Sequence, residues 1–337
     1  MSIATAPSLP AGRLMSVDAL RALAALAVTW FHLTNGYPQD SWVKASGSFG
    51  WLGVEAFFVI SGFIIPYSLH RTGYVPKKNA KQFLLKRLIR LEPPYLASIV
   101  LVIVLSELSA MAPGFKGQPV HYTWSQLLSH VGYLAGIIGY DWINVVYWTL
   151  AIEFQFYLIM AVMVIFVLKS SAILFLATAG AVALASKILQ DSIPILHFGP
   201  VFFIGIAVCR GVIGMDLRRT SMTLVVCLLL ATALLISWQC AAASFLAVAI
   251  LSIKTIKINR YLRHISVISF SLYLIHVPIG GRVVNLLRRF GDGEFYFLMT
   301  SLSGLLVSLC AAHLSWWMIE RPALRWAARV HKIDLPK

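Results

Sequence analysis

Apolar runs of membrane-spanning length follow one another along almost the whole of this chain of 337 residues. A helix needs roughly 20 mainly apolar residues to cross the hydrocarbon core of a bilayer. About ten runs reach that length, at about residues 14–34, 51–70, 91–112, 148–168, 171–189, 195–213, 221–238, 241–256, 265–285 and 296–318. We therefore expect an all-α fold, a polytopic transmembrane helical bundle of about ten spans.

The charge content agrees with this class and argues against an ordinary soluble enzyme. Charged residues make up 12% of the chain, about half of the roughly 25% found in soluble domains. The formal net charge of +15 would also suit a nucleic-acid-binding protein, but the Lys and Arg residues fall mostly in short connectors between apolar runs. Basic connectors are typical of the cytoplasmic loops of membrane proteins. The expected partner is thus the lipid bilayer and not nucleic acid.

An eleventh segment, residues 124–140, is shorter and contains His130 and several glycines. It is either a further span or a re-entrant or interfacial piece. If it does not cross, and the amino terminus is cytoplasmic, most basic residues lie in cytoplasmic loops, whereas a crossing there would leave more than half of them outside. We therefore expect a multi-pass protein of the inner (plasma) membrane with both termini cytoplasmic.

The chain shows no sign of a second, soluble domain. We expect one integral membrane domain over residues 1–337, with residues 1–12 as a flexible cytoplasmic tail. The 4 cysteines all lie inside apolar runs and have no disulfide or metal-ligand spacing. Likewise no set of His, Asp and Glu has ligand spacing, so we expect no metal.

The first run carries three polar residues that suit one helix face. Asp18 and Arg21 are three positions apart and can pair. Arg21 and His32 are eleven positions apart, which is about three turns and roughly 16 Å along a helix. The expected topology places Arg21 toward the cytoplasm and His32 near the outer end. The alternative is a structural ion pair and a histidine wetted by lipid headgroups.

Two carboxylates lie inside runs that otherwise suit lipid. Glu55 comes one turn into the second run, with Ser61 midway along it, and the glycines around them suit close helix packing. Glu153 lies about one and a half turns into the run that begins near Trp148. Ionisable groups at such depth are costly and mark functional sites by default.

A second histidine belongs to a polar face in the run at 265–285. Ser269, Tyr273 and His276 recur at i, i+4 and i+7, which is one side of a helix. A satisfied interior histidine is the alternative for His276.

The expected topology brings four of these groups to a similar depth in the outer half of the membrane: His32, Glu55, Glu153 and His276. One shared site explains this better than four structural accidents. A histidine beside a carboxylate is the arrangement needed to take a proton from a hydroxyl.

Basic residues gather where the connector at 71–90 enters the next run. Lys86, Arg87 and Arg90 would lie on adjacent faces of a helix at the membrane surface, where they suit phosphate groups. Anchoring to anionic lipid is the alternative.

Six motifs in this order resemble those of the integral membrane acyltransferase type 3 family, from residue 18 to residue 322. They are DALRALA at 18–24 with His32 behind it, GVEAFFVISGF at 53–63, RLIRLEP at 87–93, WTLAIEFQFY at 148–157, SFSLYLIH at 269–276 and ERP at 320–322. Two departures are small: Thr149 stands where Ser is commoner, and Phe154 where a second acidic residue is common. The hydrolase-like carboxy-terminal domain of some members is missing, so we expect a stand-alone transferase.

The resemblance implies transfer of an acyl group, most often acetyl from acetyl-CoA, to a hydroxyl of a cell-surface or lipid-linked saccharide. Some members of the family acylate small molecules such as macrolides. The resemblance also implies that Arg21 and His32 are required, and that Arg87 and Arg90 act on the CoA side.

These readings combine into one expected mechanism. Acyl-CoA is held by Arg87, Arg90 and Lys86, and His32 acts as general base. Glu153 is the preferred carboxylate to orient His32. The remaining candidates for substrate or oxyanion contacts are Glu55, Ser61, Tyr273 and His276, with Glu55 the second choice as the orienting group.

Two alternatives stay open at this point. Direct transfer and an acyl-histidine relay fit the residues equally well. Intramembrane His and Glu also build proton relays, so a proton-coupled transporter or flippase is the competing function.

Overall fold

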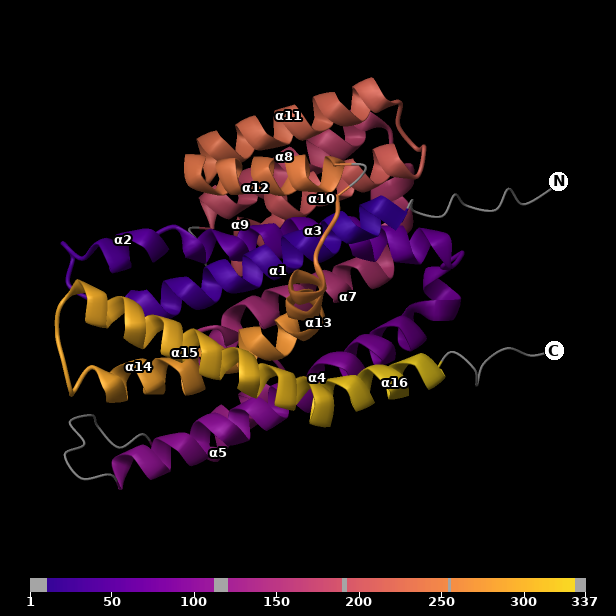
Figure 1. Ribbon diagram of the computed structural model, residues 1–337. Helices are drawn as coiled ribbons and strands as arrows, with labels where there is room; N and C mark the ends of the chain where they lie inside the picture. The colour runs from indigo at the N-terminus through magenta and orange to yellow at the C-terminus, as the bar shows by residue number, and fades with distance from the viewer. Residues whose placement is uncertain (1–10, 112–120, 190–192, 254–255, 331–337) are drawn as a thin grey trace. The chain divides into compact units, whose positions relative to one another are not determined.

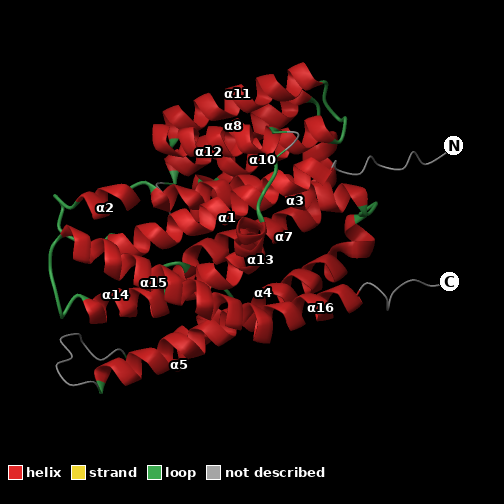
Figure 2. Ribbon diagram, in the orientation of Figure 1, coloured by secondary structure: helices red, strands yellow, loops and turns green. Residues whose placement is uncertain are grey.

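The computed structural model describes residues 11–111, 121–189, 193–253 and 256–330. These residues form helices joined by short links, and no strand occurs among them (Figures 1 and 2). Most of the expected tail at 1–12 therefore lies outside the described residues, and its flexibility stays a prediction. The all-α expectation is confirmed.

The chain divides into two compact units, and several helices contribute residues to both. The first unit comprises Met1–Ala24, Leu52–Lys81 and Gln155–Val267. Its helices are the first part of α1 (Ala11–Thr34), α3 (Gly53–Arg71), the start of α4 (Pro76–Ala110), most of α7 (Tyr147–Lys169), α8 (Ala172–Ile188), α9 (Pro194–His197), α10 (Gly199–Val212), α11 (Arg218–Leu235), α12 (Trp238–Ser252) and the first half of α13 (Arg260–Ile275).

The second unit comprises Ala25–Trp51, Gln82–Phe154 and Ile268–Lys337. Besides the remaining parts of α1 and α7, it contains α2 (Trp42–Gly47), η1 (Gly50–Leu52) up to Trp51, α4 (Pro76–Ala110) from Gln82, α5 (Trp124–Val131), α6 (Ala135–Ile138), the end of α13 (Arg260–Ile275), η2 (His276–Gly281), α14 (Arg282–Leu287), α15 (Glu294–Ser315), η3 (Trp316–Glu320) and α16 (Arg321–Arg329).

Seven helical stretches of the described chain are long and apolar enough to cross a membrane. Three shorter apolar helices, α8, α10 and α12, coincide with further expected spans. A multi-pass membrane protein is therefore confirmed, while the count of ten crossings stays a prediction. The connector before Lys86 is part of the same helix as the span that follows it, because α4 is helical from Pro76.

The eleventh segment is broken into two short helices. α5 has 8 residues and α6 has 4, so the longer one extends only about 12 Å. The hydrocarbon core is about 30 Å thick. Neither helix reaches across it, which agrees with the expectation that this segment does not cross.

Close backbone contact between α3 and α10 builds the first unit. A Cβ added at Gly62 would overlap the carbonyl oxygen of Phe202, and one added at Gly205 would overlap that of Val59. Only glycine permits this approach, as at many helix contacts in membranes. The packing account of this glycine-containing motif is thus confirmed at Gly62, next to Ser61.

A buried arginine near the end of α10, Arg210, has a structural role that no sequence pattern indicated. The guanidinium of Arg210 donates to both carboxylate oxygens of Asp216, at 2.6 and 3.0 Å. It also donates to the carbonyl oxygens of Val167 and Ser170, each at 2.7 Å, and lies over the ring of Phe175. The arginine is 2% exposed, so these contacts replace its hydration.

An aromatic stack fixes the broken eleventh segment within the second unit. The ring of Tyr133 lies between those of Tyr95 and Phe154, with centroid distances of 4.9 and 5.0 Å. Its backbone has φ of 58°, a left-handed conformation that is unusual for a bulky residue. The stack gives Phe154 a packing role at the position where a second acidic residue is common in the family.

His130, next to last in α5, is fully hydrogen-bonded and joins that helix to the loop at Ile143. Its Nδ1 donates to the carbonyl oxygen of Gln126 at 2.8 Å, and its Nε2 accepts the backbone N–H of Ile143 at 3.0 Å. Burial lowers the pKa of His130 from its ordinary value of 6.5. The folded protein therefore holds the neutral ring, and the opened loop takes up a proton more readily.

We expect acidification to loosen this loop. Because the folded pKa is the lower one, stability is lost as pH falls below about 6.5. Hydrogen exchange at the Ile143 amide, corrected for intrinsic rate, should be faster at pH 5.5 than at pH 7.5. His130→Gln should remove the pH effect. An equal pH effect in that variant would contradict the assignment.

Candidate active site

The structure brings His32 and His276 together in the second unit. Their ring centroids are 5.2 Å apart and their planes are inclined at 49°. His32 lies two residues before the end of α1 and is half-buried, whereas His276 is 0% exposed. The two histidines expected at similar depth are thus neighbours.

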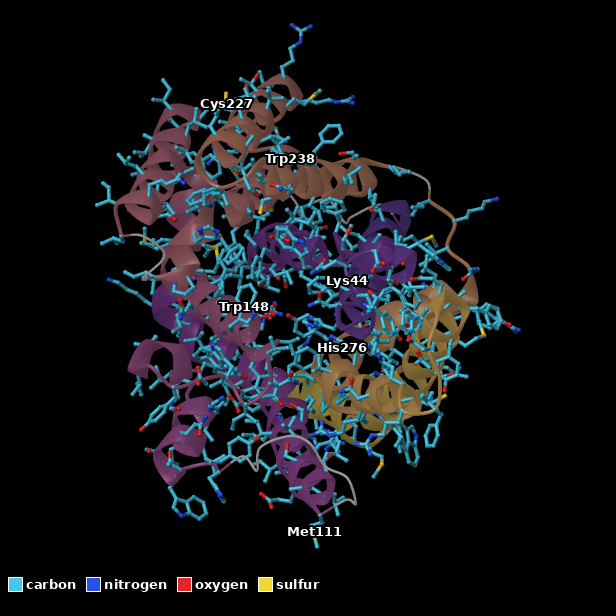
Figure 3. All side chains as sticks on the ribbon, turned by 90° about the vertical axis from the view of Figure 1, so that its left-hand side faces the viewer. Lys44, Met111, Trp148, Cys227, Trp238 and His276 are labelled. Atoms are coloured by element: carbon cyan, nitrogen blue, oxygen red, sulfur yellow. The ribbon has the colours of Figure 1, made fainter. Side chains whose placement is uncertain are left out.

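A local change of helix type places His276. The α-helical pattern of α13 ends at Ile275, and a π-helix, η2, begins at His276 and runs to Gly281. π-Helical turns inside α-helices are rare and occur frequently at functional sites. Figure 3 labels His276, which lies near the middle of the view and not at its edge.

Small residues hold the π-helix against α15. A Cβ added at Gly280 would overlap the hydroxyl of Ser308 and come within 3.0 Å of the Gly304 carbonyl oxygen. The same hypothetical atom would lie 2.9 Å from a side-chain carbon of Leu33, the residue after His32. The glycine thus lets α1, η2 and α15 meet at the level of the two histidines.

Arg282 fixes the far end of η2. Its guanidinium donates to the carbonyl oxygen of Pro278 at 2.9 Å, inside the π-helix, and to the hydroxyls of Ser106 and Ser109 on α4. These bonds tie the irregular turn to a long neighbouring helix. From the sequence, Arg282 was expected only to be one of the basic residues on the outer side of the membrane, without a structural role.

Tyr273 links the histidines to α7. Its ring centroid is 6.0 Å from that of His276, and its hydroxyl is 2.6 Å from the hydroxyl of Thr149. Thr149, the first departure from the family motif, therefore keeps the hydroxyl that Ser would supply. Glu153 follows one turn later, on the same side of α7, and is half-buried.

Ser269, Tyr273 and His276 are all buried, as one shared face predicts. A nearby carboxylate also belongs to this helix contact. Glu320 accepts hydrogen bonds from the backbone N–H and the hydroxyl of Ser271, at 3.2 and 2.6 Å. Glu320 belongs to the ERP motif, but the sequence indicates no role for it because its partner is 49 residues away.

Glu55 and Ser61 belong to the first unit. The carboxylate of Glu55 is 1% exposed, and its Oε1 accepts the thiol of Cys240 at 3.4 Å. Its other oxygen, Oε2, has no hydrogen-bond partner among the described residues. Ser61 is also buried, at 9% exposure, beside the contact of Gly62 with α10.

The remaining candidates lie on two helices. Arg21 is half-buried on α1. Its expected partner Asp18 accepts a hydrogen bond from Ser266 at 3.0 Å. On α4, Lys86, Arg87 and Arg90 are half-buried and span little more than one turn.

The guanidinium of Arg87 lies 5.4 Å from the ring centroid of Phe83. The contact with the ring face orients the guanidinium of Arg87. It does not use the N–H donors at the edge of that group. Within the described part of the chain, no group of three or more His, Cys, Asp and Glu side chains is arranged to hold a metal.

Comparison with known proteins decides the family. The profile of the acyltransferase domain matches residues 15–320. The chain belongs to this acyltransferase family. Membership confirms the resemblance drawn from the six motifs and does not favour the transporter alternative.

Two bacterial relatives are similar to about half of this acyltransferase. The peptidoglycan O-acetyltransferase OatA of Listeria monocytogenes is 32% identical over 163 residues, which are 46% of this chain and 24% of that protein. The O-acetyltransferase OatA of Staphylococcus aureus NCTC 8325 is 30% identical over 168 residues, 46% of this chain and 25% of that protein. The match thus spans about a quarter of each relative. No solved structure matches the acyltransferase at a significant level.

Proposed function

We propose that this acyltransferase moves an acyl group, most simply acetyl, from acyl-CoA to a hydroxyl of a cell-surface or lipid-linked saccharide. The observation that carries this proposal is the pair of imidazoles at a π-helical turn, His32 and the fully buried His276, 5.2 Å apart. A half-buried imidazole beside a buried one suits proton transfer to and from an acceptor hydroxyl. The names of both relatives support acetyl as the group, and the name of the Listeria relative supports peptidoglycan, a cell-wall saccharide polymer, as the class of acceptor.

His32 acts as the general base in the proposed reaction. As the acceptor oxygen attacks the thioester carbonyl carbon, one nitrogen of His32 takes the hydroxyl proton. The tetrahedral intermediate then collapses with cleavage of the C–S bond, and the CoA thiolate receives that proton from His32. The products are an ester and free CoA thiol. An acyl-histidine relay would require the same ring to be acylated first.

Other groups have proposed roles around this step. Tyr273 is a proposed contact for the oxyanion. The hydroxyl of Thr149 donates to the carbonyl oxygen of Val146, so Tyr273 donates to Thr149 and would have to turn its proton from Thr149 to the developing oxyanion.

Glu153 lies one turn beyond Thr149 on α7 and is proposed to supply a negative charge near His32. Glu55 and Ser61 are proposed substrate contacts.

The basic turn of α4 is proposed to hold the phosphates of acyl-CoA. Lys86, Arg87 and Arg90 lie within a little more than one helical turn, and two guanidinium forks suit the diphosphate and 3′-phosphate groups. Arg21, eleven residues before His32 on α1, is proposed to contact the polar arm of the donor.

A comparison of glycans tests the proposed function. Cells that express the chain and cells that lack it should differ in the mass of their surface glycans by one acyl increment, which mild base should remove. Identical glycan masses at confirmed expression would refute the proposal.

Replacing Arg87 and Arg90 with Gln should raise the acetyl-CoA concentration needed for half-maximal transfer by about 10-fold or more. Each charged hydrogen bond contributes roughly 1.5–3 kcal/mol, and 1.4 kcal/mol is a factor of ten. Initial rates in isolated membranes measure the effect. Arg218→Gln, an exposed charge at the start of α11, is the matched control. An unchanged acetyl-CoA dependence in the double variant would argue against phosphate binding.

A further inference from the structure

The bonding of His276 fixes which of its nitrogens carries hydrogen. Its Nδ1 lies 3.0 Å from the carbonyl oxygen of Leu272. A carbonyl oxygen can only accept, so Nδ1 must be the donor and carries the proton. In the neutral ring, Nε2 then has a lone pair and no hydrogen.

The Nε2 atom of His276 is a buried hydrogen-bond acceptor to which no described residue donates. It has no hydrogen-bond partner among the described residues, although the side chain is 0% exposed. An unsatisfied buried acceptor costs about 1–3 kcal/mol, so a native protein normally supplies it with a donor or keeps it for function.

His32 is within reach of this acceptor. Two imidazoles joined by a nitrogen-to-nitrogen hydrogen bond of about 3 Å have centroids a little more than 5 Å apart. The observed separation is 5.2 Å. This separation is compatible with such a bond when the half-buried His32 ring is turned so that one of its nitrogens faces Nε2, while His276 is held by Leu272.

We propose that His276 is a positioning residue that accepts the N–H of His32 and thereby fixes the tautomer of the general base. This inference rests on the proposed function and deepens it. One nitrogen of His32 donates to Nε2 of His276, and the other keeps its lone pair for the acceptor hydroxyl. A neutral imidazole thus takes the orienting role that the sequence analysis gave to Glu153.

The π-helix serves this arrangement. A continuous α-helix would carry its i to i−4 bonding on through His276, whereas the π-turn rotates the residues that follow Ile275. Gly280 and Arg282 hold the turn from its other end. The irregular backbone is therefore explained as the device that directs a second imidazole toward the first.

Two amide variants separate positioning from a structural role. The terminal amide of glutamine reaches the place of Nε2, whereas that of asparagine reaches only the place of Nδ1. His276→Gln retains an acceptor for His32, and we expect its turnover to stay within about 10-fold of the wild type. His276→Asn retains the bond to Leu272 and loses the acceptor, and we expect turnover to fall about 10²-fold.

The measurement uses isolated membranes that contain the full chain, radiolabelled acetyl-CoA and the glycans already present in those membranes. Positioning predicts that His276→Asn lowers the maximal rate and leaves the half-saturating acetyl-CoA concentration unchanged, at equal protein level. Higher activity in His276→Asn than in His276→Gln would overturn the inference, because it would mean that only the Leu272 bond matters. If the wild-type chain transfers no label while a known acyltransferase does so in the same assay, the proposed function itself fails, and this inference fails with it.

Discussion

Replacing His32 with alanine is expected to lower acyl transfer by a factor of about 10² to 10⁴, the usual contribution of a general base. The loss should appear in the maximal rate, because the role proposed for His32 is on the acceptor hydroxyl and not on the phosphates of the donor. Protein level and detergent-solubilised stability should stay near those of the wild type, since the ring is only half-buried near the end of α1.

His313→Ala provides the control for this variant. His313 is an exposed histidine near the end of α15, so its loss tests the general effect of removing an imidazole from the second unit. Transfer of label from acetyl-CoA to membrane glycans, divided by the amount of protein, measures both variants. Full activity in His32→Ala would exclude its role as the base.

The second large effect is expected at Arg210 and concerns stability. Arg210→Ala leaves the carboxylate of Asp216 without its charged partner, and Asp216 is only 8% exposed. It also removes donors from two main-chain carbonyl oxygens. Removing one member of a buried pair costs about 3–5 kcal/mol. We expect a large drop in the amount of folded protein in membranes and in the unfolding temperature in detergent.

A double variant shows whether the unpaired charge of Asp216 causes the loss of stability. Arg210→Met combined with Asp216→Leu removes both charges and should recover part of the stability, because apolar replacement of a whole buried pair is often tolerated. The carbonyl oxygens of Val167 and Ser170 still lose their donors, so recovery should be incomplete. Wild-type stability in Arg210→Ala would show that the pair contributes little.

Much of the architecture follows from hydropathy and charge. Apolar runs predicted the helices because a span must satisfy its backbone groups internally. The pattern of basic connectors predicted that residues 124–140 do not cross, and the short α5 and α6 agree. The helices α8, α10 and α12 are shorter than an ordinary span. Composition alone did not predict this, because the apolar runs continue beyond the ends of these helices.

The candidate site was predictable only in part. Spacing predicted that Ser269, Tyr273 and His276 share one face, and all three are buried. Comparing depths predicted one shared site for His32, Glu55, Glu153 and His276, of which the structure shows the two histidines as neighbours. The π-helix has no readable sequence signal, since it arises from tertiary contacts such as those of Gly280. The orienting role expected for Glu153 stays a prediction, because periodicity cannot tell whether a carboxylate or the imidazole of His276 contacts His32.

Contacts between distant segments were the least predictable features. Three contacts are of this kind: Glu320 with Ser271, Arg210 with the carbonyl oxygens of Val167 and Ser170, and the stack on Tyr133. Each joins residues whose proximity depends on how helices pack. Periodicity describes one helix at a time and contains no information on its neighbours. A buried polar residue in an apolar run indicates that it has a partner, but the sequence does not show which residue that partner is.

The most direct test of the central claim is transfer of labelled acetyl from acetyl-CoA to glycan in membranes made permeable, so that no ion gradient remains. The account predicts base-labile label on saccharide that depends on the protein and disappears in His32→Ala. Label transfer equal in the wild type and in His32→Ala, or no transfer until a gradient is restored, would contradict it.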